Sequence, residues 1–125
     1  MIARTFTYVD YDGIERTETH HFHLEQAEIL KMEMGVSGGM RKLLQKIIDE
    51  KDSKRLYEHF ENLVQKSYGV KSNDGRRFDK DPKLLDEFMQ TPVYSMLIME
   101  LAFDTDKAIE FTNGILPKAL TEKKA

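Results

Sequence analysis

Three histidines within four positions form the only cluster in the sequence whose side chains could bind a metal ion. His20, His21 and His23 lie at the end of an alternating, strand-like segment. On a strand, His21 and His23 share one face, where two imidazoles could reach one ion. A metal site needs a third protein ligand, and no histidine or carboxylate at a matching spacing supplies one. We therefore expect exposed polar strand residues and no metal.

A glycine-rich stretch resembles a phosphate-binding turn in composition only. Gly35-Val36-Ser37-Gly38-Gly39 precedes a helical pattern, and a helix N-terminus can bind phosphate. The stretch has no Gly-Lys-Ser/Thr, and the segment before it is helical in pattern rather than strand-like. Adjacent glycines are unfavourable inside a helix, so we expect a hinge between two helices.

Two arginines beside an aromatic residue could bind nucleic acid. Arg76 and Arg77 could contact a phosphate backbone while Phe78 stacks on a base. Asp74, Asp79 and Asp81 flank the pair, and two arginines make a small electrostatic footprint. We expect a solvated turn and no nucleic-acid partner.

No residue pattern nominates a catalytic site or a cofactor. The chain has no cysteine, which excludes thiolate zinc sites, iron–sulfur clusters, disulfides and cysteine nucleophiles. No nucleophile elbow frames any serine. His59 stands between charged neighbours on a helical segment, where we expect it to be exposed. We expect a protein that is not an enzyme.

Length and composition limit the folds that could hold such a site. The chain has 125 residues, of which 40% are hydrophobic, and its 22 acids and 19 bases give a net charge of −3. This length and apolar content suit one domain, which we place at residues 1–120, with a disordered tail at 121–125. No stretch reaches the ~18 apolar residues of a membrane span, and the N-terminus lacks a signal-peptide core. We expect a cytoplasmic protein.

The predicted fold is α+β and mainly α. A short N-terminal β-hairpin precedes a compact bundle of five to six short helices. Residues 1–23 alternate as strands about a turn at Asp10–Gly13, and residues 24–117 form the helical body. Breaks fall at the glycine-rich stretch and near Asp52-Ser53. Gly69 is a candidate C′ residue, and Asp74-Gly75 predicts a second small hairpin ending at Phe78. Helices begin after Asp81, Thr91 and Asp104 or Thr105, and the last ends near Asn113-Gly114, with Pro117 blocking extension.

The segment Val93–Phe103 is apolar on more than one face. Val93, Leu97 and Leu101 form one helical stripe, and Met96, Met99 and Phe103 form another, roughly 100° away. Such a helix is either central to the core or presents its second stripe to a partner. The sequence leaves both readings open.

Three blocks in order resemble the phage tail assembly chaperones of long-tailed phages (siphophages) and prophages. The blocks are Ser67-Tyr68-Gly69-Val70-Lys71-Ser72-Asn73-Asp74-Gly75-Arg76-Arg77-Phe78, then Phe88-Met89-Gln90-Thr91 followed by Tyr94, then Phe111-Thr112-Asn113-Gly114-Ile115-Leu116-Pro117. The resemblance covers roughly residues 22–117 and departs from the usual pattern at Asp79–Pro82 and Pro92-Val93.

The resemblance implies a protein that binds and solubilises the tape measure protein and helps recruit tail tube subunits in the host cytoplasm. Such proteins are absent from the mature virion, and a homo-oligomer is possible. For the helix-binding groove we expect a wall made by the Val93–Phe103 segment, with partner-binding residues Met89, Tyr94, Met96, Met99, Phe103 and Phe111. Two alternatives remain: a minor tail or connector subunit retained in the virion, and a small nucleic-acid-binding regulator.

Overall fold

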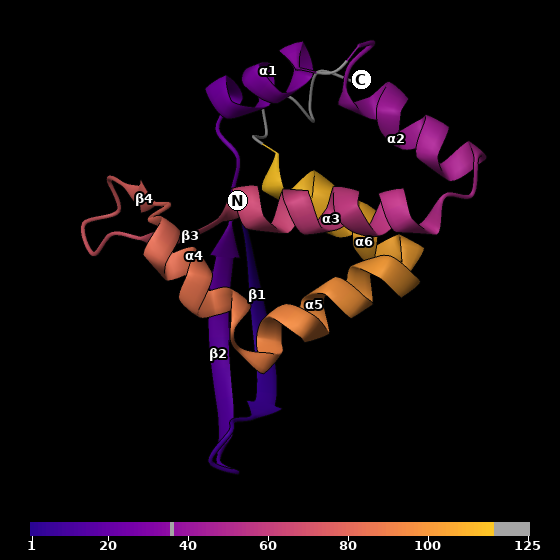
Figure 1. Cartoon of the computed structure of the whole chain (residues 1–125). Coiled ribbons are helices and arrows are strands. Elements are labelled where there is room, and N and C mark those ends of the chain that lie inside the picture. The colour runs from indigo at the N-terminus through magenta and orange to yellow at the C-terminus, as the bar shows by residue number, and fades with distance from the viewer. Residues whose placement is uncertain (36, 117–125) are drawn as a thin grey trace.

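The computed structural model describes residues 1–35 and 37–116 and shows two hairpins, each followed by three helices (Figure 1). The described elements are, in order, β1 (Ile2–Val9), β2 (Glu15–Phe22), α1 (Gln26–Met34), α2 (Met40–Asp49), α3 (Ser53–Ser67), β3 (Tyr68–Lys71), β4 (Phe78–Asp79), α4 (Pro82–Met89), α5 (Pro92–Phe103) and α6 (Thr105–Ile115). The predicted α+β class, with six short helices in this part of the chain, is confirmed. Pro117 and the predicted tail lie outside the described residues.

The first hairpin pairs β1 and β2 over their whole length, from Ile2 opposite Phe22 to Val9 opposite Glu15. Its alternation separates two faces, because successive side chains of a strand point to opposite sides. Phe6 and Phe22 are buried on the inner face, whereas the outer face carries threonines. The Asp10 carboxylate accepts the N–H groups of Asp12 and Ile14, both at 2.9 Å, and so shapes the predicted turn.

The second hairpin extends the same sheet, which the sequence did not predict. β3 pairs with the end of β2, and the strand order is β1-β2-β3-β4. The predicted role of Gly69 as a left-handed helix cap is wrong, because Gly69 lies in β3 and has no positive φ. Its missing side chain instead admits Phe78: a Cβ on Gly69 would lie 2.5 Å from the ring.

Three aspartates cap helices: Asp81 as predicted, Asp52 at the predicted break, and Asp104 rather than the alternative Thr105. The side chains of Asp52, Asp81 and Asp104 accept backbone N–H groups in the first turns of α3, α4 and α6. Each cap satisfies a donor that has no partner inside the helix. Thr91 precedes α5 as predicted, but its hydroxyl donates to the carbonyl oxygen of Phe88 at 2.7 Å instead of capping α5.

The last helix runs slightly further than predicted. α6 continues through Gly114 to Ile115, although its end was expected near Asn113-Gly114. The glycine is used for a close approach, since a Cβ there would lie 2.7 Å from Cδ1 of Ile2. The start of β1 therefore packs directly against the end of α6.

The buried side chains of the described residues form a core between the sheet and α3 to α6. At its centre the rings of Tyr68 and Phe88 stack with centroids 4.2 Å apart, and Phe22 meets Phe88 and Phe111 edge to face. The buried hydrophobic members are Phe6, Phe22, Leu24, Phe60, Leu63, Val64, Tyr68, Phe88, Val93, Leu97, Ile98, Leu101, Ala108, Phe111 and Ile115. Aromatic residues thus join segments that are far apart in sequence.

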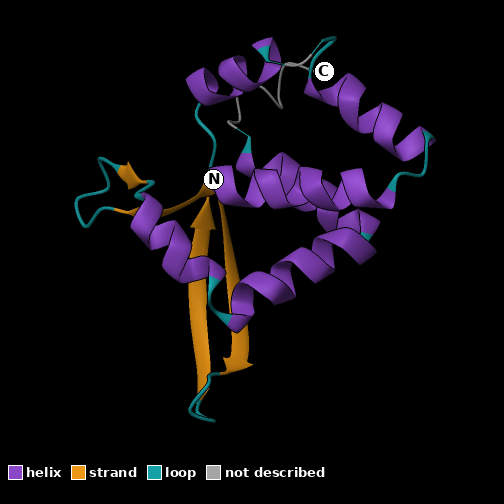
Figure 2. Ribbon diagram, in the orientation of Figure 1, coloured by secondary structure: helices purple, strands orange, loops and turns teal. Residues whose placement is uncertain are grey.

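The first two helices lie at the margin of this core, against which Ile29 and Met32 of α1 pack. In Figure 2, α1 and α2 lie along the end of the molecule opposite the projecting hairpin tip. α1 has no fully buried residue, and α2 packs on α3. Gly38 and Gly39 separate the two helices with φ angles of 82° and 87°, which confirms the predicted break. Val36 of the glycine-rich stretch lies outside the described residues.

Candidate functional site

The three histidines of the predicted cluster do not face one another. His20 lies on the inner face of β2, within ring-contact distance of Phe6, Tyr68 and Phe88. His23 follows the strand, and its Nε2 lies 2.7 Å from the Glu25 carboxylate. Within residues 1–35 and 37–116, no group of three or more histidine, aspartate or glutamate side chains could hold a metal ion. The expectation of exposed strand histidines is wrong for all three, because His20, His21 and His23 are half-buried. The side chains of His20 and His23 are 17% and 14% exposed, and Phe88 of α4 covers His20.

The arginine pair lies in an ordered turn between β3 and β4. The backbone N–H of Arg76 donates to Asp74, and that of Arg77 donates to the Ser72 hydroxyl at 3.0 Å. Ser72 in turn donates to the Asp74 carboxylate at 2.7 Å. The backbone N–H groups of both arginines therefore stabilise the turn, which agrees with the predicted turn.

Both predicted stripes of α5 exist, and they have opposite environments. Val93, Leu97 and Leu101 are buried. Met96, Met99 and Phe103 are 41%, 53% and 79% exposed, respectively. α5 therefore contributes one face to the core and presents three large apolar side chains to solvent.

The six residues predicted to bind a partner do not form one surface. Met89 and Tyr94 are half-buried, and the Tyr94 hydroxyl donates to the Glu61 carboxylate and accepts from Gln65. Phe111 is fully buried against Phe22, so it supports the core and has no exposed surface in this conformation. Only Met96, Met99 and Phe103 are widely exposed.

A large apolar groove is lined mainly by helices other than α5, although α5 was predicted to form its wall. Its volume is about 1020 Å³, and α1, α2, α3 and α6 line it, with only Leu101 and Ala102 from α5. The main apolar lining residues are Leu24, Ile29, Met32, Leu44, Ile47, Ile48, Leu56, Phe60, Leu63, Ala108, Ile109, Ile115 and Leu116. Leu44, Ile47 and Ile48 recur at helical spacing in the sequence, but that spacing does not show that they share a groove with α6.

The groove keeps apolar surface open to solvent. Ile48 on α2 is 50% exposed and Ile109 on α6 is 55% exposed, and both line the groove. Isolated exposed apolar residues are ordinary, but a continuous apolar concavity of this size marks a site for a partner or ligand. Apolar side chains from several helices of this chain can therefore contact one bound partner at the same time.

Polar residues of the groove include one histidine that differs from expectation. His59 on α3 lines the groove and is 9% exposed, although the sequence predicted an exposed side chain. Burial lowers the pKa of His59 below its ordinary value of 6.5. The groove therefore contains a neutral imidazole at neutral pH, with Lys51 and Asp52 among its other polar lining residues.

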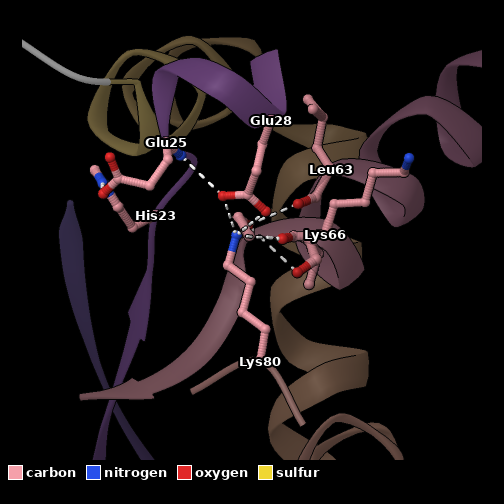
Figure 3. Close-up of polar contacts among 8 residues, drawn as sticks. His23, Glu25, Glu28, Leu63, Lys66 and Lys80 are labelled. Atoms are coloured by element: carbon pink, nitrogen blue, oxygen red, sulfur yellow. Dashed lines mark hydrogen bonds and ion pairs between the residues drawn. The ribbon is translucent and has the colours of Figure 1, made fainter. Parts of the chain in front are cut away.

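A single lysine fastens the wall formed by α1 to the body of the protein (Figure 3). The Lys80 ammonium donates to both carboxylate oxygens of Glu28 at 2.8 and 2.7 Å, and to the carbonyl oxygen of Lys66 at 2.9 Å. Lys66 lies in the last turn of α3, where the negative end of the helix dipole favours a cation. Because α1 has no fully buried residue, this polar contact and the half-buried Ile29 and Met32 together hold the groove wall to the body.

Glu28 is held in its charged form by that contact. Burial by itself raises the pKa of Glu28, but the backbone N–H of Glu25 and the Lys80 ammonium outweigh burial and leave the pKa lowered. The Glu28 carboxylate accepts the Glu25 N–H at 2.9 Å as part of a capping box. One side chain thus both starts α1 and anchors it.

Comparisons with known proteins bear on the whole chain. A family model described as phage tail assembly chaperone matches residues 1–125. No curated protein and no solved structure matches the chain. None of the helices in the described part of the chain has the length and apolar character needed to cross a membrane.

Proposed function

The chain belongs to the phage tail assembly chaperone family, and from this premise we propose that it binds the tape measure protein and keeps it soluble during tail assembly. It also helps bring tail tube subunits to the growing complex and leaves before the virion is complete. The work is protein binding and needs no cofactor.

The observation that carries this proposal is the apolar groove between α2, α3 and α6. An amphipathic helix recognises such a groove by placing side chains at positions i, i+3, i+4 and i+7 into it. Leu44 and Ile48 offer contacts from one wall and Ile109 from the facing wall, with the buried Ile47 and Ala108 behind them. A groove lined by two helical walls suits one helix of about 10 Å diameter.

The chemistry of the partner fits this geometry. A tape measure protein is a long, largely helical chain, and an exposed apolar stripe along it promotes aggregation. Covering that stripe requires apolar surface that adapts to successive segments. The lightly packed wall α1, tethered through Glu28 and Lys80, supplies such adaptability.

Coexpression with the tape measure protein tests the proposal. Ile48→Asp and Ile109→Asp place a charge in the groove at half-exposed positions, so the fold is preserved. We expect both variants to lose the complex in a tagged pull-down, and the tape measure protein to become insoluble. Val70→Asp is the matched control, because Val70 is 41% exposed on β3 outside the groove. Full binding by both groove variants would overturn the assignment of the groove.

Mass spectrometry of purified virions tests the chaperone role separately. We expect no copy of the chain in mature particles. A stoichiometric copy would favour a structural subunit retained in the tail.

A further inference from the structure

β1 is the outermost strand of the sheet, and its outer edge is free in the described part of the chain. The Asp10 N–H donates to the Ile14 carbonyl oxygen at 2.9 Å, so this opposed pair is hydrogen-bonded. Hydrogen-bonded pairs alternate along an antiparallel ladder. The even-numbered residues of β1 therefore bond to β2, and Ala3, Thr5, Thr7 and Val9 direct their N–H and C=O groups outward.

Pairing on the other side of β2 agrees with this alternation. The His23 N–H donates to the Ser67 carbonyl oxygen at 2.8 Å, and His21 stands opposite Gly69. Odd-numbered residues of β2 thus face β3, which leaves its even-numbered residues to face β1. The odd-numbered residues of β1 therefore direct their backbone N–H and C=O groups away from β2.

This edge has few of the features that protect edge strands from pairing, and its one inward-pointing charge, on Arg4, is neutralised by an ion pair. Folded proteins block free edges with proline, lysine, bulges or very short strands. β1 has eight residues, a register without a bulge, and neither proline nor lysine. Its single charged side chain, Arg4, is paired with Glu100 of α5 at 2.5 Å. A second strand can therefore approach without an unpaired charge in its way.

The exposed stripe of α5 lies beside the same edge. Glu100 reaches Arg4 of β1, which fixes the side of α5 that meets the strand. At 100° per residue, Met96 and Phe103 lie about 40° and 60° beyond Glu100, away from the buried stripe. In Figure 1, α5 leaves β1 on the side opposite β2. An added strand would run next to β1 with its inner side chains under this stripe.

We propose that the free edge of β1 and the stripe Met96–Met99–Phe103 form a self-association surface, through which two copies of the chain pair about a twofold axis. The two β1 strands run antiparallel, with Thr5 opposite Thr7 of the second copy and Ala3 opposite Val9. This register uses all four outward-facing residues of each β1. It is independent of the groove and of its occupant.

The surface is self-complementary, which selects a second copy as the occupant. On the outer face, the pairing continues the rows of the Thr5–Thr19 and Thr7–Thr17 hydroxyl pairs, at 2.8 and 3.0 Å, across both copies. On the inner face, two uncharged apolar stripes approach each other. The opposite edge of the sheet, β4, has only two residues, so the sheet closes as a dimer and offers little for continued growth.

Light scattering on the protein as it elutes from a size-exclusion column measures its mass and so tests the dimer. We expect a mass twice the 14.6 kDa of one chain, and a single-chain mass for Thr7→Pro, which deletes an outward N–H. Thr7→Ala is the matched control: it loses the same hydroxyl, retains the N–H and remains a dimer. Edge strands tolerate proline where the N–H faces solvent, and circular dichroism verifies the fold.

A second variant keeps the test decisive if Thr7→Pro does not fold. Met99→Glu introduces a charge at an exposed site, and we expect it to give a single-chain mass. Ile48→Asp, in the groove, remains a dimer while losing the tape measure protein, which separates this inference from the proposed function. A monomeric wild-type protein, or a dimer that survives Met99→Glu, overturns the inference.

Cysteine pairing tests the register, since the chain has no cysteine of its own. Opposed hydrogen-bonded residues have Cα atoms about 5.5 Å apart, within the range of a disulfide. We expect oxidation of an equal mixture of Thr5→Cys and Thr7→Cys proteins to give more crosslinked dimer than either protein alone. Equal crosslinking in all three samples contradicts the register.

Discussion

Two phenylalanines of the predicted binding set provide a direct test of how the structure assigns them. Phe111 is fully buried and meets Phe22 with ring centroids 5.3 Å apart, whereas Phe103 is 79% exposed. Both were expected to contact a partner. Replacing each by alanine removes the same atoms from two different environments.

The structure gives different magnitudes for the two changes. Removing a fully buried phenylalanine leaves a cavity and costs about 3–5 kcal/mol of unfolding free energy. Phe103 has only about a fifth of its surface covered. Full burial of such a side chain contributes about 1.5–3 kcal/mol, so Phe103→Ala should cost only about 0.3–0.6 kcal/mol.

Urea unfolding followed by far-ultraviolet circular dichroism measures both changes. With a urea dependence of about 2 kcal/mol per molar, the midpoint should fall by roughly 1.5–2.5 M for Phe111→Ala and by at most about 0.3 M for Phe103→Ala. The experiment is run at a concentration where light scattering shows single chains, so self-association does not contribute. Equal shifts for the two variants, or a loss below about 1 kcal/mol for Phe111→Ala, would refute this account of the core.

Three further predictions concern stability. Burial lowers the pKa of both His20 and His59 below 6.5, with Glu18 partly opposing the effect at His20; the unfolded chain therefore binds more protons below pH 6.5, and stability should fall as pH decreases from that value. Urea midpoints measured from pH 7.5 to 5 check this, and a double His→Gln variant should show a weaker decline. Asp104→Ala should cost about 1 kcal/mol because the Lys107 N–H loses its acceptor, whereas Asp104→Asn should retain most of the stability in the same assay. Gly69→Ala should cost about 1–3 kcal/mol of unfolding free energy, because its Cβ would lie 2.5 Å from the Phe78 ring and 2.9 Å from the Asp79 carbonyl oxygen. A melting temperature equal to that of the wild-type protein would contradict the close approach.

Features set by neighbouring residues were predictable from the sequence. The turn at Asp10–Gly13, the caps Asp52, Asp81 and Asp104, and the break before α2 all depend on interactions within a few residues. The chemistry of a carboxylate near a free N–H, or of a glycine at positive φ, does not require the rest of the fold. The family was recognisable for a similar reason, since its three blocks stand in order along the chain.

Features set by distant segments were not predictable in the same way. Gly69 has the sequence context of a helix cap, yet its position in β3 depends on pairing with His21, far away in the chain. His20 was expected to be exposed, and the aromatic rings that cover it come from β3 and α4. Neither contact leaves a pattern in the local sequence.

The sequence by itself determined the turn of the first hairpin and where α3, α4, α5 and α6 begin, because local backbone preferences and side-chain caps act over a few residues. It also determined that α5 is apolar on two faces. Only the tertiary structure decided which face is buried, since Leu97 and Met99 are both large apolar residues, yet Leu97 is fully buried and Met99 is 53% exposed. The groove is likewise tertiary: α2, α3 and α6 each bring one apolar stripe, and a concave surface exists only once those stripes are brought together.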